Sequence, residues 1–123
     1  MGKKALLLAA AIAATGPACA DWEKSARHEQ QTWYIDYSTL RVSGGTRRVW
    51  TMVSGGDRLG NLSTKTFDEY DCKEGRFRTL SMIAFTGEMG EGRASIIEGP
   101  PSWHYIAPES VGDSLMKAVC NRR

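Results

Sequence analysis

Few residues in this chain are of types that act in catalysis. The two histidines, His28 and His104, are the only candidates for general acid or base chemistry near neutral pH. Neither has a sequence-local partner arranged as in a catalytic dyad, and no serine lies in a Gly-x-Ser-x-Gly nucleophile motif. We therefore predict that the protein is not an enzyme and has no catalytic residues.

Four acidic residues lie close together at Asp68, Glu69, Asp71 and Glu74. Carboxylate oxygens bind calcium, but this spacing is not that of an EF-hand loop. Alternation along a strand would also send Asp68 and Glu69 to opposite faces. The pattern predicts a solvated hairpin end and no metal site.

The glycines of residues 87–92 are spaced somewhat as in nucleotide-binding loops. The segment lacks the Lys-Ser/Thr pair of a phosphate-binding loop, and it contains Glu88 and Glu91, which would repel phosphate. We expect a flexible hairpin loop and no cofactor.

The overall charge argues against nucleic acids and anionic membranes as partners. The 123 residues include 16 basic and 14 acidic ones, a formal net charge of +2. Lys3 and Lys4 account for this excess, and they lie in a segment that we expect to be removed. A neutral mature protein lacks the positive field on which non-specific binding to nucleic acid depends.

The first twenty residues have the pattern of a secretory signal peptide. Lys3 and Lys4 precede an apolar run at 5–14, which is followed by a helix-breaking Gly-Pro pair and the small residues Ala18 and Ala20. The apolar run is about half the length that a membrane-spanning helix needs. We predict cleavage between Ala20 and Asp21, a mature domain at 21–123, and a location in the periplasm or at the cell surface.

An alternative stays open at Cys19. A cysteine after a short apolar segment is where bacterial lipoproteins are acylated, and the protein would then be tethered to a membrane. Gly16 stands three positions upstream, where that signal usually has a leucine-like residue.

Loss of Cys19 with the signal peptide would leave two cysteines, Cys72 and Cys120. An even pair in an exported chain predicts a disulfide. Closing a loop of about fifty residues would stabilise the fold by roughly 4 kcal/mol. The alternative is a reactive or metal-binding thiol, but the sequence has no CxxC spacing and no histidine near either cysteine.

Residue types along the mature chain favour strands separated by glycine-rich turns. We expect Ser38 to Arg41 to form a short turn, Gly44 and Gly45 a tight turn, and residues 54–61 the most flexible stretch. The predicted strands are an edge strand within 21–30 and strands at 32–37, 47–53, 62–71, 76–86, 93–97 and 103–106.

The C-terminal segment changes to a helical period. Ser110 can cap a helix, Asp113 follows at capping-box spacing, and apolar residues from Val111 to Val119 share one face. The fold class predicted is α+β: a mainly antiparallel β-sheet meander covered by one C-terminal α-helix.

A set of residues follows in a characteristic order along the mature chain: Trp33 to Asp36, Ser38, Arg41, Arg48 to Trp50, Ser63 to Lys65, Glu69 to Cys72, Arg76, Arg78 to Ser81, Gly87 to Gly92, Trp103, Ile106 to Ser110 and Val119 to Cys120. In this order the set resembles the surface-adhesin protein E family of exported bacterial proteins. The resemblance implies a small β-rich exported domain with a C-terminal helix and a disulfide. It also implies adhesion to host matrix and plasma proteins, although the family looks like a broad group of envelope proteins, and we transfer no ligand-binding residue from it.

Aromatic and arginine side chains are the remaining candidates for recognition. We expect Trp33 and Trp50 to belong to the core and the arginines to be solvated or stacked on aromatics. Trp103 and Tyr105 would share one face of a short strand, as a candidate binding patch. One hypothesis is an adhesion or envelope module that binds another protein, with exposed edges that also permit homodimers. The other is a soluble periplasmic structural or stress-related protein with no host ligand.

Overall fold

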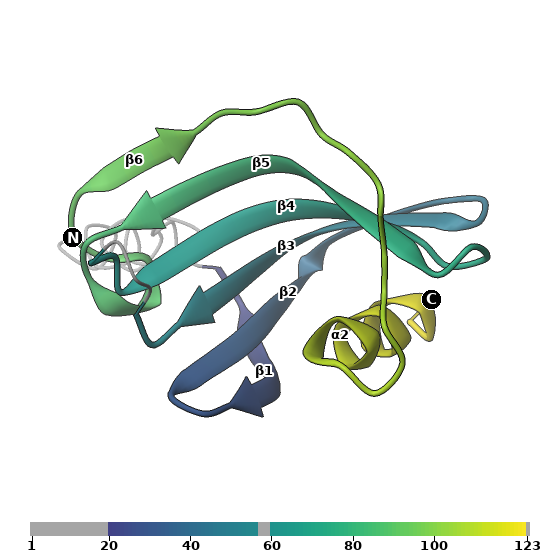
Figure 1. Ribbon diagram of the computed structural model, residues 1–123, viewed down its shortest axis with the longest axis horizontal. Helices are drawn as coiled ribbons and strands as arrows, with labels where there is room; N and C mark the ends of the chain where they lie inside the picture. Colours follow the sequence, from purple (N-terminus) through teal and green to yellow (C-terminus); the bar gives the residue numbers. More distant parts are fainter. Residues whose placement is uncertain (1–19, 57–59, 123) are drawn as a thin grey trace, which may run out of the picture.

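A computed structural model describes residues 20–56 and 60–122 (Figure 1). The predicted signal peptide therefore lies almost wholly outside the described residues, as do positions 57–59 of the stretch expected to be flexible. The described elements are β1 (Trp22–His28), β2 (Gln31–Ser43), β3 (Thr46–Ser54), β4 (Ser63–Asp71), β5 (Arg76–Phe85), the 3₁₀ turn η1 (Glu88–Gly90), β6 (Ala94–Ile97), β7 (His104–Tyr105) and α2 (Val111–Cys120).

The strands form one antiparallel sheet in the order β1-β2-β3-β4-β5-β6, with β7 also paired to β5. Each strand up to β6 pairs with the next one along the chain, and short turns connect β1 to β2, β2 to β3 and β4 to β5. Gly75, with a φ of +70°, closes the turn between β4 and β5. The predicted meander with one C-terminal helix is confirmed.

The turn expected at Ser38 to Arg41 was wrong. β2 continues through these residues, and its pairing with β3 is interrupted between Asp36 and Arg41. Side chains supply local hydrogen bonds there: Ser38 N–H donates to Asp36 Oδ1, and the Thr39 hydroxyl donates to the Asp36 carbonyl and accepts from Trp50 N–H. These turn-forming residues therefore produce an irregularity within one long strand.

The core lies between the sheet and α2, which Figure 1 shows against one face of the sheet. Its buried residues are Ile35, Val49, Tyr70, Leu115 and Val119. The helix contributes Leu115 and Val119 one turn apart, as the helical period predicts. Trp33 packs against this cluster as expected.

The predicted cap of α2 is also present. Ser110 Oγ accepts a hydrogen bond from Asp113 N–H at 3.1 Å. The Asp113 carboxylate in turn accepts from Glu109 N–H at 3.0 Å and pairs with Lys117 Nζ at 3.1 Å. The first bond satisfies a backbone donor that the helix leaves free, which fixes where α2 begins.

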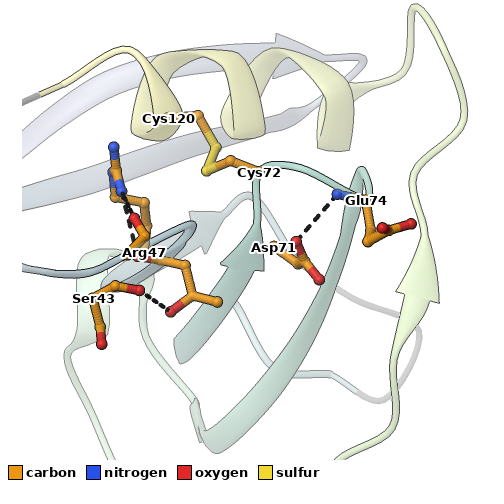
Figure 2. The surroundings of a disulfide bond; sticks show 8 residues. Ser43, Arg47, Asp71, Cys72, Glu74 and Cys120 are labelled. Carbon is orange, nitrogen blue, oxygen red and sulfur yellow. Dashed lines mark hydrogen bonds between the residues drawn. A yellow bond between two sulfur atoms is a disulfide. The ribbon is translucent and has the colours of Figure 1, made fainter.

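A disulfide between Cys72 and Cys120 joins the end of α2 to the turn after β4 (Figure 2). In that turn, Glu74 N–H donates to Asp71 Oδ1 at 3.1 Å, and Cys72 N–H donates to the carbonyl of Gly45 in the β2–β3 turn. The bridge thus attaches the helix to an end of the sheet that hydrogen bonds already order.

Candidate functional site

The two faces of the sheet have different surroundings. Val49 and Tyr70 pack beneath α2, so their alternating neighbours Trp50 and Glu69 point the other way. We call the side away from α2 the open face. Its side chains include Trp22, Asp36, Arg48, Trp50, Lys65, Phe67, Glu69, Arg76, Arg78, Ile83, Phe85 and Ile96.

The open face also holds Trp50, so the expectation of a core position was wrong for this residue. Trp50 contacts the ring of Phe67 with centroids 5.3 Å apart, and both rings are half-buried. Trp50 pairs across the β3–β4 ladder with Phe67, one position out of phase with the core residue Val49. Strand alternation explains the difference, because neighbouring residues of β3 serve opposite faces.

On the helix side, a cavity of about 450 Å³ lies between α2 and the sheet. Its lining is mostly apolar, but the carboxyl group of Asp68 lies on its wall. Asp68 is buried, with 5% of its surface accessible. Three threonine hydroxyls, those of Thr51, Thr66 and Thr79, lie 2.8–2.9 Å from its oxygens.

Burial favours a neutral Asp68, and the number of hydrogens around its carboxyl group fits that form. Thr51 and Thr66 lie 2.7 Å apart and both contact Oδ2, so three contacts join three oxygen atoms. The two hydroxyls bring only two hydrogens, and a proton on the carboxyl group would supply the third. Burial raises the pKa of Asp68, against the lowering effect of the hydrogen bonds from Thr79, Thr66 and Thr51.

The prediction that the acidic residues form a solvated hairpin end was wrong for two of the four. Asp68 and Glu69 are both buried, on opposite faces as strand alternation requires. Asp71 pairs with Arg76 at 3.1 Å, and Glu74 is exposed in the turn. Hydrogen bonds and ion pairs to neighbouring strands offset the free-energy cost of burying these two carboxyl groups. The spacing of the acidic residues in the sequence could not reveal these partners.

On the open face, Glu69 accepts hydrogen bonds from two arginines. Arg48 Nε lies 2.8 Å from Oε2, and Arg78 Nη2 lies 2.6 Å from Oε1. Burial alone would raise the pKa of Glu69, but the hydrogen bonds and charges of Arg48 and Arg78 lower it overall. Arg48, Glu69 and Arg78 thus form a fixed row of charged side chains across β3, β4 and β5, which we call the charge row.

Trp103 extends this row. Its ring lies 4.5 Å from the guanidinium carbons of both Arg76 and Arg78. The expectation that arginines stack on aromatics is therefore confirmed for these two. Trp103 itself is half-buried by these contacts, while Tyr105 is 73% exposed beside Arg76. Of the candidate patch, Tyr105 is the freely accessible member.

The exposed edge strand β6 was not singled out from the sequence. All four of its residues are exposed, and Ile96 and Ile97 have 73% and 44% of their surface accessible. Ile96 pairs with Ile83, so it continues the open face to the sheet edge. An apolar edge strand is a template for pairing with another chain. The alternating pattern of 93–97 predicted the strand, but not that it would end the sheet.

Both histidines lie at exposed positions beside polar neighbours. The nitrogen of His104 lies 3.2 Å from Ser102 Oγ, and His28 lies 3.7 Å from Glu29, both at exposed positions. No group of three or more metal-ligating side chains is present in this part of the chain. In the same residues, no helix has the length and apolar character to cross a membrane.

The fold defines a class: small antiparallel-sheet domains with one C-terminal helix, as in Haemophilus influenzae protein E. One crystal form of that protein superposes with a TM-score of 0.66 at 9% identity, covering 85% of this chain and 90% of the other. Its selenomethionine form gives 0.67 at 10% identity, covering 85% and 88%. Protein E from a non-typeable strain gives 0.63 at 10% identity, covering 86% and 78%.

The family model for surface-adhesin protein E matches residues 22–121, and the chain belongs to that family. This membership places it among adhesin-like surface proteins. No curated protein sequence matches the chain.

Proposed function

We propose that the protein is an exported, non-enzymatic adhesion module that binds another protein, either a host matrix protein or an envelope component. The binding elements are the open face of the sheet and the edge strand β6. The observation that carries this proposal is the exposed apolar edge at Ile96 and Ile97. Ile96 continues a face rich in arginine and aromatic side chains.

The chemistry of this surface suits protein recognition. An incoming extended segment can add to β6 by main-chain hydrogen bonds. Tyr105 and the row formed by Arg48, Arg78 and Trp103 offer the residue types that dominate protein interfaces. The same edge pairing permits a homodimer, which sedimentation velocity would detect as a change with protein concentration.

Export is part of the proposal. The family and the Cys72–Cys120 bridge both fit an oxidising compartment. We propose removal of residues 1–20, with Asp21 as the first residue of the mature domain 21–123. The intact mass of unreduced protein from the cell envelope tests this. A chain that begins with acylated Cys19 would replace the cleaved form with a tethered lipoprotein.

Binding to an immobilised panel of extracellular-matrix and plasma proteins tests adhesion. The test variant is Ile96→Lys, which places a charge on the edge strand. Val42→Lys is the matched control, because Val42 is also an exposed apolar residue, 52% accessible, but lies on β2 near the β2–β3 turn. We expect the wild type to bind at least one panel member. Ile96→Lys should weaken this binding roughly tenfold, or about 1.4 kcal/mol, and Val42→Lys should leave it unchanged.

Two outcomes would count against this proposal. Equal binding by both variants would place the contact away from β6. If the protein binds no panel member, and its intact mass is that of unacylated residues 21–123, a periplasmic structural protein with no host ligand would be favoured.

A further inference from the structure

A second pocket, of about 310 Å³, lies on the open face at the end of the sheet near the start of β1. We call it the Trp22 pocket. Its volume is near the lower limit of roughly 300 Å³ for small-molecule sites. Its lining combines aromatic and aliphatic walls with few polar groups. Seven lining residues belong to the mature domain, and the eighth, Ala20, ends the segment that we propose is removed; the seven are Trp22, Asp36, Thr39, Trp50, Lys65, Ile83 and Phe85.

One polar group in this pocket is the carboxylate of Asp36, which is only 4% exposed. Its Oδ1 accepts hydrogen bonds from the backbone N–H and the hydroxyl of Ser38. Its Oδ2 accepts none from the residues that the structure describes. Asp36 is thus a largely buried residue whose second carboxylate oxygen has no donor among the described residues and lies open to the pocket, where a bound ligand can donate to it.

The second polar group is the ammonium of Lys65. It lies 5.1 Å from the ring centre of Phe85 and 5.7 Å from that of Trp22. It forms no ion pair within residues 20–56 and 60–122. The backbone of η1 lies close to the lysine stem, because a Cβ on Gly90 would be 2.5 Å from Lys65 Cε. The lysine is thus held against the rings with its charge uncompensated by a carboxylate.

We propose that the Trp22 pocket binds a small zwitterion with an apolar body, namely an α-amino acid with an aromatic or large aliphatic side chain. Its ammonium pairs with Asp36, its carboxylate with Lys65, and its side chain packs on the aromatic walls. A ligand with only a negative charge would leave Asp36 unpaired, and a ligand with only a positive charge would be repelled by Lys65. This inference is independent of the proposed adhesion.

The cavity beneath α2 differs in this respect. Although it is larger, its one buried carboxyl group, Asp68, has hydroxyl partners on both oxygens. Its lining therefore presents no unmet polar demand, and its apolar walls belong to the core. The Trp22 pocket is the one whose charges point to a ligand.

Isothermal titration calorimetry of the protein isolated from the cell envelope tests the proposal with L-phenylalanine. Two probes each lack one charge: 3-phenylpropionate has no ammonium and phenethylamine has no carboxylate. We expect a Kd below about 1 mM for L-phenylalanine and binding at least tenfold weaker for both probes. Absent binding, or equal affinity for all three compounds, would overturn the proposal.

Variants locate the site. Lys65→Met keeps the apolar stem and removes the charge, and we expect it to weaken L-phenylalanine binding at least tenfold. Lys73→Met is the matched control, since Lys73 is exposed in the turn between β4 and β5, and it should bind as the wild type does. Equal loss in both variants, or in neither, would refute the assignment.

The four tryptophans give a readout that needs no variant. In ¹⁵N spectra, added L-phenylalanine should shift the indole signals of Trp22 and Trp50. It should leave those of Trp33, beneath α2, and Trp103, stacked on Arg76, in place. Shifts confined to Trp33 or Trp103 would put the ligand elsewhere and overturn the proposal.

Discussion

Replacement of Glu69 by glutamine tests the charge row of the open face. The Glu69 side chain is 6% exposed and binds Arg48 and Arg78, whose side chains are 49% and 30% exposed. Glutamine keeps one acceptor oxygen and turns an N–H toward the other arginine. A hydrogen bond between charged groups contributes about 1.5–3 kcal/mol. Because water can solvate the released arginine, we expect the lower half of that range, about 2 kcal/mol.

Urea denaturation at neutral pH measures this loss of free energy. In thermal unfolding, the same loss should lower the melting temperature by about 10 °C for a domain of this size. Glu98→Gln is the matched control, because Glu98 is exposed in the segment after β6. Its free energy of unfolding should change by less than about 0.5 kcal/mol. A loss below that limit for Glu69→Gln as well would refute the idea that the paired carboxylate stabilises the sheet.

The same variant makes a pH prediction. The folded pKa of Glu69 lies below its unfolded value of 4.5, so the stability it contributes is present above about pH 4.5. That contribution is lost as the pH falls through the folded pKa. The difference in unfolding free energy between wild type and Glu69→Gln should therefore shrink on acidification. A difference that stays constant down to the acid transition would contradict the assigned pKa shift.

Three further predictions concern the core side of the sheet. Replacing Cys72 and Cys120 together by serine should cost about 4 kcal/mol in urea denaturation, and a reducing agent should then have no further effect; an unchanged midpoint would refute a stabilising bridge. Leu115→Ala should cost about 3 kcal/mol, since it enlarges the cavity beneath α2, and a cost under about 1 kcal/mol would mean that the helix does not close the core. Because the folded pKa of Asp68 is raised, the contribution of this residue to the free energy of unfolding declines as the pH rises above 3.8. The stability of Asp68→Asn should therefore rise relative to that of the wild type over that range. A parallel pH dependence of the two proteins would contradict this prediction.

The sequence predicts the elements of this fold well because each has a local cause. Glycine at position 75 closes the β4–β5 turn, and Ser110 caps α2 through its own hydroxyl. The cysteine pair predicted the bridge between the helix and the turn after β4, which the structure contains. These features need no knowledge of distant neighbours.

What could not be predicted depends on partners from other strands. The sequence predicted a turn at Ser38 and Thr39, yet β2 continues through them, and Trp50 N–H of β3 donates to the Thr39 hydroxyl. The sequence predicted that Asp68 and Glu69 are solvated, yet both are buried. Their partners are Thr51 and Arg48 on β3, Thr79 and Arg78 on β5, and Thr66 on β4 itself. Only the register of the sheet brings these groups together.

The Trp22 pocket and the β6 edge could not be predicted from the sequence for the same reason. Trp22, Asp36 and Lys65 come from three different strands and share one wall only after the sheet forms. The exposure of Ile96 depends on β6 being the last strand. Trp103, in contrast, was a candidate from residue type alone, and the structure stacks it on Arg76 and Arg78.

Retention of bacteria on a surface coated with matrix protein tests adhesion by the β6 edge most directly. Cells that display equal amounts of wild-type, Ile96→Lys and Val42→Lys protein are compared under the same flow. Adhesion through β6 predicts that Ile96→Lys cells are retained severalfold less than wild type while Val42→Lys cells are retained equally. Equal retention of all three, or retention no greater than that of cells lacking the protein, would contradict it.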